Sequence, residues 1–160
     1  MNFEEILKQI HQNVEDNVPA IQEEDGFIVI EKNRTFSLPK DFNTTIAYEG
    51  DVNSQIVTFI CPKIVEGHDL SNCQEKRLRW KNNSSGNEGS TKLSYILEGE
   101  DKMLLRWNAP PEAFTKSGIL EISISIFDLI DGKLAYSWNT SSLKVLKVGE
   151  TLNSVGYKID

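Results

Sequence analysis

The sequence predicts a mainly β protein: a two-sheet antiparallel sandwich of about nine or ten strands, preceded by one N-terminal α-helix. Three observations lead to this prediction. Within residues 118–128, apolar and polar side chains alternate strictly from Leu120 to Ile126. Shorter segments of the same kind are separated by turn residues at regular spacing. The one clear helical pattern lies at the N-terminus.

The segment 118–128 gives the clearest strand signal in the chain. Its apolar side chains occupy every second position: Leu120, Ile122, Ile124 and Ile126. Because successive side chains of a strand point to opposite faces, this segment has one apolar face and one polar face. A second layer must cover the apolar face, and we expect the rest of residues 27–148 to supply it.

The remaining strand segments are shorter. We expect strands at 26–31, 33–38, 46–48, 55–61, 75–81, 93–97, 103–107, 134–138 and 143–148. The segment 55–61 is fairly apolar on both faces, which is typical of a central strand. Asp131-Gly132 predicts a hairpin turn. The Asn- and Ser-rich stretch 82–90 predicts an exposed, mobile loop.

The N-terminal helix is predicted over residues 2–18, where Pro19 ends the pattern. Its apolar stripe consists of Phe3, Leu7, Ile10 and Val14. An isolated helix of about 16 residues is marginal in water, so the stripe must pack against something. It packs either on its own β domain or, because the spacing is also that of a coiled-coil seam, on a partner or a second copy. We adopt the second interpretation and take the four stripe residues as candidate partner-binding residues.

The predicted organisation has three parts. Residues 1–25 form the helix and a linker, 26–150 form the β-sandwich domain, and 151–160 form a C-terminal tail. The net charge is −7 and no basic face is clustered, which argues against binding to nucleic acid. No apolar run reaches the roughly 20 residues that span a bilayer, and no secretion signal is visible, so we expect no membrane insertion.

The sequence predicts no catalytic, cofactor-binding or metal-binding residues. His68 is interpreted as a turn residue, and Cys61 and Cys73 as ordinary buried thiols, because neither a nucleophile motif nor closely spaced zinc ligands are present. The three tryptophans are expected in the core. A carbohydrate-stacking platform is the alternative interpretation, with Trp80 and Tyr95 as its candidate residues.

Several short motifs occur in an order that resembles one protein family. They are Arg-Thr-Phe-Ser-Leu-Pro at 34–39, Ile-Ala-Tyr-Glu-Gly-Asp at 46–51, Ile-Val-Thr-Phe at 56–59, Cys-Pro at 61–62, Gly-His-Asp-Leu-Ser at 67–71, Arg-Trp at 106–107, the Gly-opened strand at 118–127 and Tyr-Ser-Trp-Asn-Thr at 136–140. Over about residues 28–148 this order resembles the N-terminal domain of the baseplate upper proteins of phages that infect Gram-positive bacteria. The resemblance implies an immunoglobulin-like β-sandwich in a virion, which holds receptor-binding parts or docks to a tail or capsid hub.

Family members typically continue into a long coiled coil and a distal module, whereas this sequence ends at Asp160 and carries an additional N-terminal helix. We therefore expect a small virion component, such as a tail or baseplate adaptor or the base of a capsid-attached head fibre. It is expected to be non-enzymatic, to form a homo-oligomer, to bind other virion proteins, and to assemble in the cytoplasm of the bacterial host. The alternatives are a carbohydrate-binding module that recognises the host cell wall and, less favoured, a hydrolase on a β scaffold.

Overall fold

The computed structural model describes residues 26–52 and 56–152 of the 160-residue chain. The predicted N-terminal helix lies outside the described residues, and with it the stripe of Phe3, Leu7, Ile10 and Val14. Most of the predicted C-terminal tail also lies outside them.

The first of two large sheets, sheet A, has five strands in the order β2-β1-β4-β10-β9. Its strands are β1 (Ile28–Ile30), β2 (Phe36–Ser37), β4 (Ile56–Pro62), β9 (Ser94–Glu98) and β10 (Lys102–Asn108). The strand β4 lies inside the sheet and is buried on both faces, as its apolar sequence predicts. Neighbouring strands are antiparallel except β1 and β4, which are parallel.

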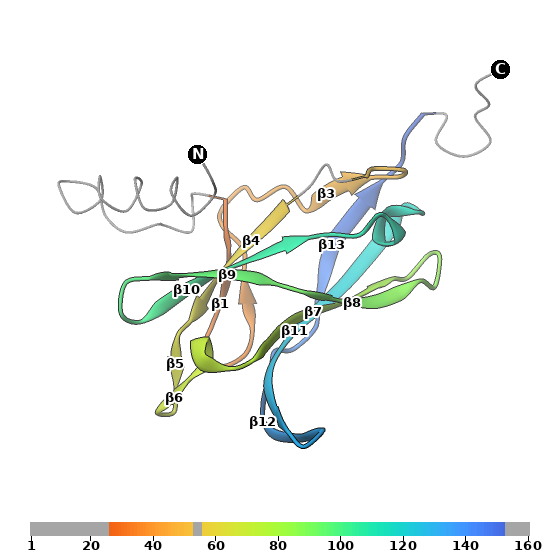
Figure 1. The fold of residues 1–160 in the computed structure, drawn as a ribbon. Coiled ribbons are helices and arrows are strands. Elements are labelled where there is room, and N and C mark those ends of the chain that lie inside the picture. Colours follow the sequence, from red (N-terminus) through yellow and green to blue (C-terminus); the bar gives the residue numbers. More distant parts are fainter. Residues whose placement is uncertain (1–25, 53–55, 153–160) are drawn as a thin grey trace, which may run out of the picture.

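The second sheet, sheet B, has six strands. Five follow the order β3-β13-β11-β7-β8, and β12 pairs with the far part of β11. Their bounds are β3 (Thr45–Tyr48), β7 (Glu75–Asn82), β8 (Glu88–Lys92), β11 (Gly118–Ile130), β12 (Lys133–Asn139) and β13 (Leu143–Gly149). Figure 1 shows the long strand β11 running through this sheet and continuing into the hairpin with β12.

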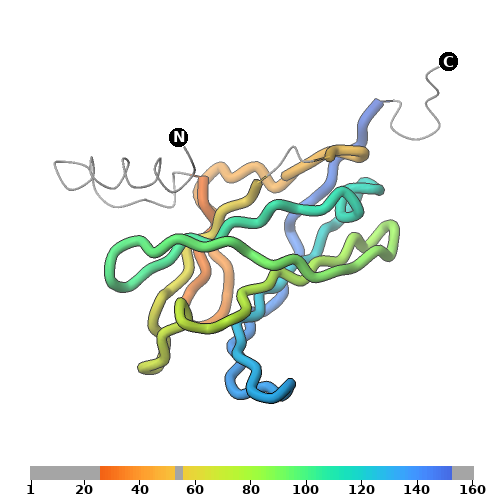
Figure 2. The backbone as a smooth tube through the Cα atoms, viewed as in Figure 1, coloured from red at the N-terminus to blue at the C-terminus, as the bar shows by residue number. Residues whose placement is uncertain are grey.

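Two short strands and two 3₁₀ turns complete the described fold. The strands β5 (Ile64–Val65) and β6 (His68–Asp69) form a small hairpin, which leads into the turn η2 (Leu70–Asn72). The turn η3 (Pro111–Phe114) lies between β10 and β11. The tube in Figure 2 shows that the β5–β6 and β11–β12 hairpins both extend beyond the two large sheets.

One apolar core joins the inner faces of sheets A and B. Sheet A contributes Phe59, Met103, Leu105 and Trp107, and sheet B contributes Leu78, Leu120, Ile122, Ile124 and Ile126. The four alternating apolar residues of β11 are all buried, as their period predicts. All three tryptophans are buried as well. The described chain is therefore a two-layer β structure with its main core between the sheets. A second, small cluster contains the buried Ile60 and Leu104 of sheet A.

Each of the ten predicted strand segments contains a strand of the structure, so the mainly β prediction is confirmed. Two finer expectations were wrong. The sheets are not purely antiparallel, because β1 pairs with β4 and β3 pairs with β13 in parallel. The stretch 82–90 is not simply an exposed loop, because Asn82 is fully buried and β8 begins at Glu88. The immunoglobulin-like arrangement stays a prediction.

Candidate metal centre

The small hairpin β5–β6 sets the position of His68. Its turn contains Glu66 and Gly67, both with positive φ, at 51° and 78°. Positive φ at both central residues is the conformation of the tightest hairpin turns. The chain then turns through η2, whose N-cap is Asp69 and whose C-cap is Cys73. One 3₁₀ turn therefore separates His68 from Cys73 and brings both side chains to the same end of the molecule.

The third member of the cluster, Asp128, comes from the long strand β11. The register of β11 against β12 shifts between Asp128 and Leu129, where β12 has one additional residue, Ala135, between the paired residues Tyr136 and Leu134. Asp128 itself pairs with Tyr136, so the two side chains lie on the same face of the hairpin. The carboxylate oxygen Oδ1 of Asp128 accepts a hydrogen bond of 2.6 Å from the backbone N–H of Gln74, which fixes it beside the η2 turn.

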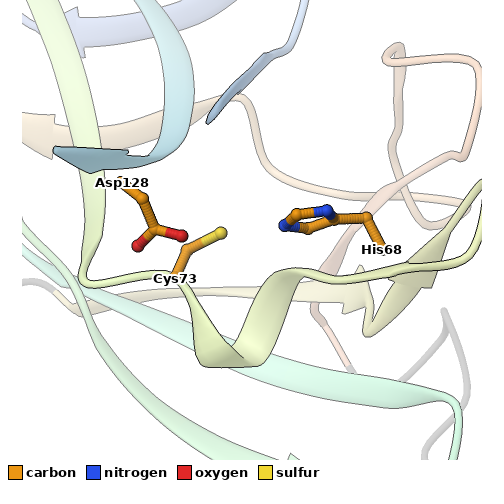
Figure 3. A group of neighbouring side chains, drawn as sticks. All are labelled: His68, Cys73 and Asp128. Carbon is orange, nitrogen blue, oxygen red and sulfur yellow. The ribbon is translucent and has the colours of Figure 1, made fainter. Parts of the chain in front are cut away.

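These three side chains converge at the point shown in Figure 3, where the sulfur of Cys73 lies between the imidazole of His68 and the carboxylate of Asp128. One ring nitrogen, the sulfur and one carboxylate oxygen all lie within 4.8 Å of one another. Cys73 is buried, and His68 and Asp128 are partly exposed. The His68 ring also stacks on Tyr136 of β12, with 3.6 Å between ring centroids and 4° between planes. The cluster thus combines His68 of β6, Cys73 at the end of η2 and Asp128 of β11, and Tyr136 of β12 packs against it.

The electrostatics of the cluster argue against a free nucleophile. Burial, followed by the negative charge of Asp128, raises the pKa of the Cys73 thiol to about 11. The thiol is therefore protonated at neutral pH, whereas nucleophilic cysteines have a lowered pKa. His68, Cys73 and Asp128 do carry the nitrogen, sulfur and oxygen ligands that zinc prefers.

Comparisons with protein-family models and with curated proteins find no match for this chain.

A buried lysine lies next to the cluster. The ammonium of Lys76 donates hydrogen bonds to the backbone oxygens of Ser71, at 3.0 Å, and Cys73, at 2.8 Å. It also lies over the ring of Tyr95, 3.9 Å from the centroid. Burial lowers the pKa of Lys76. Its donors point to carbonyl oxygens of the η2 turn, so the side chain holds the backbone that carries Cys73.

The candidate stacking residues Trp80 and Tyr95 are not brought together as a platform. Trp80 belongs to β7 of sheet B and is buried, with its indole so close to Gly89 that an added Cβ there would lie 2.8 Å from the ring. Tyr95 belongs to β9 of sheet A and is half exposed, with the Lys76 ammonium over its ring. A stacking platform needs an open aromatic face.

Sequence reasoning missed the cluster of His68, Cys73 and Asp128. The prediction that Cys61 and Cys73 are buried and unpaired is confirmed. No closely spaced zinc ligands are visible in the sequence, whereas the structure brings these three ligand side chains together. The short spacing from His68 to Cys73 was the available signal. Asp128 gave none, because only the pairing of β11 brings it there.

Proposed function

We propose that this chain is a non-enzymatic phage virion structural protein, a tail, baseplate or capsid-attached adaptor that docks other virion or receptor-binding components. The ordered motifs described above support the phage assignment. The observation that carries the docking role is the β11–β12 hairpin, whose far end projects beyond the rest of sheet B (Figures 1 and 2). The tip of this hairpin is apolar.

The tip of this hairpin exposes large aliphatic side chains. Ile130 is 65% exposed and Leu134 is 64% exposed, and the neighbouring Leu129 is also exposed. They surround the turn Asp131-Gly132, which the sequence predicts and the structure contains. Fully burying one such side chain against a partner stabilises a complex by roughly 1.5–3 kcal/mol. A projecting apolar tip on a rigid β body suits an element that inserts into a neighbouring protein subunit.

A non-catalytic role agrees with the chemistry of the described residues. The Cys73 thiol is protonated at neutral pH, and the Lys76 ammonium is engaged by backbone oxygens. The groove on the outer face of sheet B is lined mainly by charged and small polar side chains, and Trp80, the aromatic residue in its lining, is buried. These features support the adaptor over the hydrolase and over the carbohydrate-binding module.

Replacing both tip residues, Ile130→Ser and Leu134→Ser, is expected to reduce capture of virion components by about tenfold or more, because two apolar anchors are lost. The measurement is a pull-down with the purified, tagged protein from phage-infected cells, followed by identification of the retained proteins. Thermal stability is expected to be nearly unchanged, since both side chains are exposed in the free protein.

The matched control is Val145→Ser, which replaces an exposed apolar residue on β13, away from the hairpin. It is expected to retain capture. If the native protein retains no virion component, the proposed function is wrong. If the tip variant retains as much as the native chain, docking does not use this hairpin.

The N-terminal stripe is the second attachment element in this proposal. We expect the intact chain to be an oligomer in solution, and a chain lacking residues 1–25 to be a folded monomer. Light scattering after size exclusion gives both masses, and circular dichroism reports folding.

A monomeric intact chain that cannot fold without residues 1–25 would also have a structural explanation. The outer face of sheet A carries a row of apolar side chains, Val29, Ile60, Leu104 and Ile96, with Phe27 packed beside it. If the intact chain is a monomer and the chain lacking residues 1–25 is an unfolded monomer, residues 1–25 complete the core of their own domain. Oligomerisation through the stripe would then be excluded.

A further inference from the structure

We infer that His68, Cys73 and Asp128 form a zinc-binding site that fastens the β5–β6–η2 segment to the base of the β11–β12 hairpin. The site does not depend on the proposed adaptor function. Its three side chains have no part in the proposed docking.

The ligand set matches the chemistry of zinc. Zinc in proteins takes thiolate sulfur, imidazole nitrogen and carboxylate oxygen in tetrahedral geometry, and three protein ligands leave a fourth position for water. The thiolate disfavours magnesium and calcium, which prefer oxygen ligands. Zinc binding displaces the proton of the Cys73 thiol, and the resulting thiolate together with the carboxylate of Asp128 balances the charge of a divalent cation.

The geometry lies close to that of a loaded site. Zinc–ligand bonds of about 2.0–2.3 Å place tetrahedral ligand atoms about 3.5 Å apart. The three ligand atoms are already within 4.8 Å of one another, so closure needs movements of about 1 Å. His68 and Asp128 are partly exposed, and their exposure gives the ion a path of entry.

Neighbouring groups that contact the three ligand residues hold them in place, as such groups do in known metal sites. The N–H of Gln74 donates a hydrogen bond to Oδ1 of Asp128, which holds the carboxylate beside the segment that carries Cys73. The flat stacking on Tyr136 fixes the plane of the His68 imidazole. The hydrogen bonds from Lys76 hold the backbone at Cys73 and direct the ammonium toward carbonyl oxygens. Such outer contacts typically change metal affinity 10–100-fold.

The pairing of β11 with β12 places Asp128 beside the ring on which His68 stacks. Asp128 pairs with Tyr136, and directly opposite residues of an antiparallel pair lie on the same face. The His68 ring stacks on Tyr136, so the carboxylate meets a histidine and a cysteine that come from a different part of the chain. A bound ion would join the three segments.

The test is zinc binding by the full chain, purified under reducing conditions, stripped with a chelator and titrated with zinc. We expect one zinc per chain, a melting temperature that rises with zinc concentration, and, with cobalt as the probe, the absorption of a cobalt–thiolate bond. His68→Ala, Cys73→Ser and Asp128→Asn should each weaken binding by about tenfold or more. Cys73→Ser should also abolish the thiolate absorption.

Two control variants separate loss of a ligand from general damage. Asp131→Asn removes a carboxylate from the tip of the same hairpin, and Cys61→Ala removes the other buried thiol. Both are expected to bind zinc like the native chain. If one ligand variant fails to fold, zinc binding by the other two ligand variants decides the test.

The inference is overturned if the native chain binds no zinc, if the cobalt complex lacks thiolate absorption, or if the ligand variants bind as well as the controls. Capture of virion components by the same variants is a separate readout. Failure of the zinc site therefore leaves the adaptor proposal standing, and failure of capture leaves the zinc site standing.

Discussion

Replacing Ile124 with alanine is expected to lower the free energy of unfolding by about 2–5 kcal/mol. Ile124 lies in the middle of β11, is 0% exposed and pairs with the buried Leu78 of β7. Truncating it removes three carbon atoms from a core that both sheets share, and the rigid strands on either side cannot collapse fully into the space. The loss is a large share of the 5–15 kcal/mol that typically stabilises a domain.

Urea denaturation of the native chain and the variant measures this effect through the shift in midpoint at unchanged slope. The matched control is Ile119→Ala, the same substitution on the same strand at a position that is 42% exposed. Its effect is expected to stay below about 1 kcal/mol. Equal losses at the two positions would contradict the assignment of the inner and outer faces of β11.

The strand β11 shows why much of this fold was predictable. Alternation of apolar and polar residues is a local signal, and a strand with one buried face must carry it. Leu120, Ile122 and Ile126 accordingly fill the core beside Ile124. The same reasoning located the ten expected strand segments and the Asp131-Gly132 turn.

The arrangement of the strands was not predictable by this route. Alternation states which residues share a face, but it does not state which strands are neighbours. The parallel pair β1–β4 joins Ile28 to Phe59, and the parallel pair β3–β13 joins Thr45 to Lys147. These pairings depend on contacts between distant parts of the chain. The short strands β5 and β6 escaped prediction because two residues carry no periodicity.

The His68, Cys73 and Asp128 cluster was hidden for the same reason. Two of its members lie close in sequence, and the third is brought there by the pairing of β11 with its neighbours. A ligand set of this kind becomes visible only when the pairing of strands is known. The candidate residues Trp80 and Tyr95 illustrate the converse, because alternation placed them in strands but did not reveal that they belong to different sheets.

Asn82 is the clearest case in which composition misled. An Asn- and Ser-rich stretch predicts an exposed loop, yet the Asn82 side chain is fully buried and satisfied by four hydrogen bonds. Its amide NH₂ donates to the backbone oxygens of Ala113, at 3.0 Å, and Lys116, at 2.8 Å. Its Oδ1 accepts from the backbone N–H groups of Ser84 and Ser85, each at 3.0 Å. One side chain thus joins the β7–β8 turn to η3 and to the segment that follows it.

Asn82→Asp is therefore expected to destabilise the protein strongly at neutral pH, by about 3–5 kcal/mol. The substitution keeps the shape and the acceptor for Ser84 and Ser85. It replaces two donors by a carboxylate oxygen that faces the carbonyl oxygens of Ala113 and Lys116. A buried carboxylate aimed at carbonyl oxygens has a raised pKa, because both burial and the carbonyl dipoles disfavour its charged form.

The pH dependence gives this prediction its sign. Folding raises the pKa of the carboxyl at position 82 above its value of about 3.9 in the unfolded chain. Below about pH 3.9 the carboxyl is protonated in both states and costs little stability. As the pH rises through the pKa of the folded state, the variant loses stability. The deficit of Asn82→Asp relative to the native chain is therefore expected to be smallest near pH 4 and to grow toward pH 7. Urea denaturation across this range measures it. Asn83→Asp, at the exposed neighbouring position, is the matched control, and its deficit is expected to stay small at every pH. A deficit at position 82 that does not change with pH would mean that the carboxylate escapes into solvent, and that the Asn82 amide does not hold these two segments together.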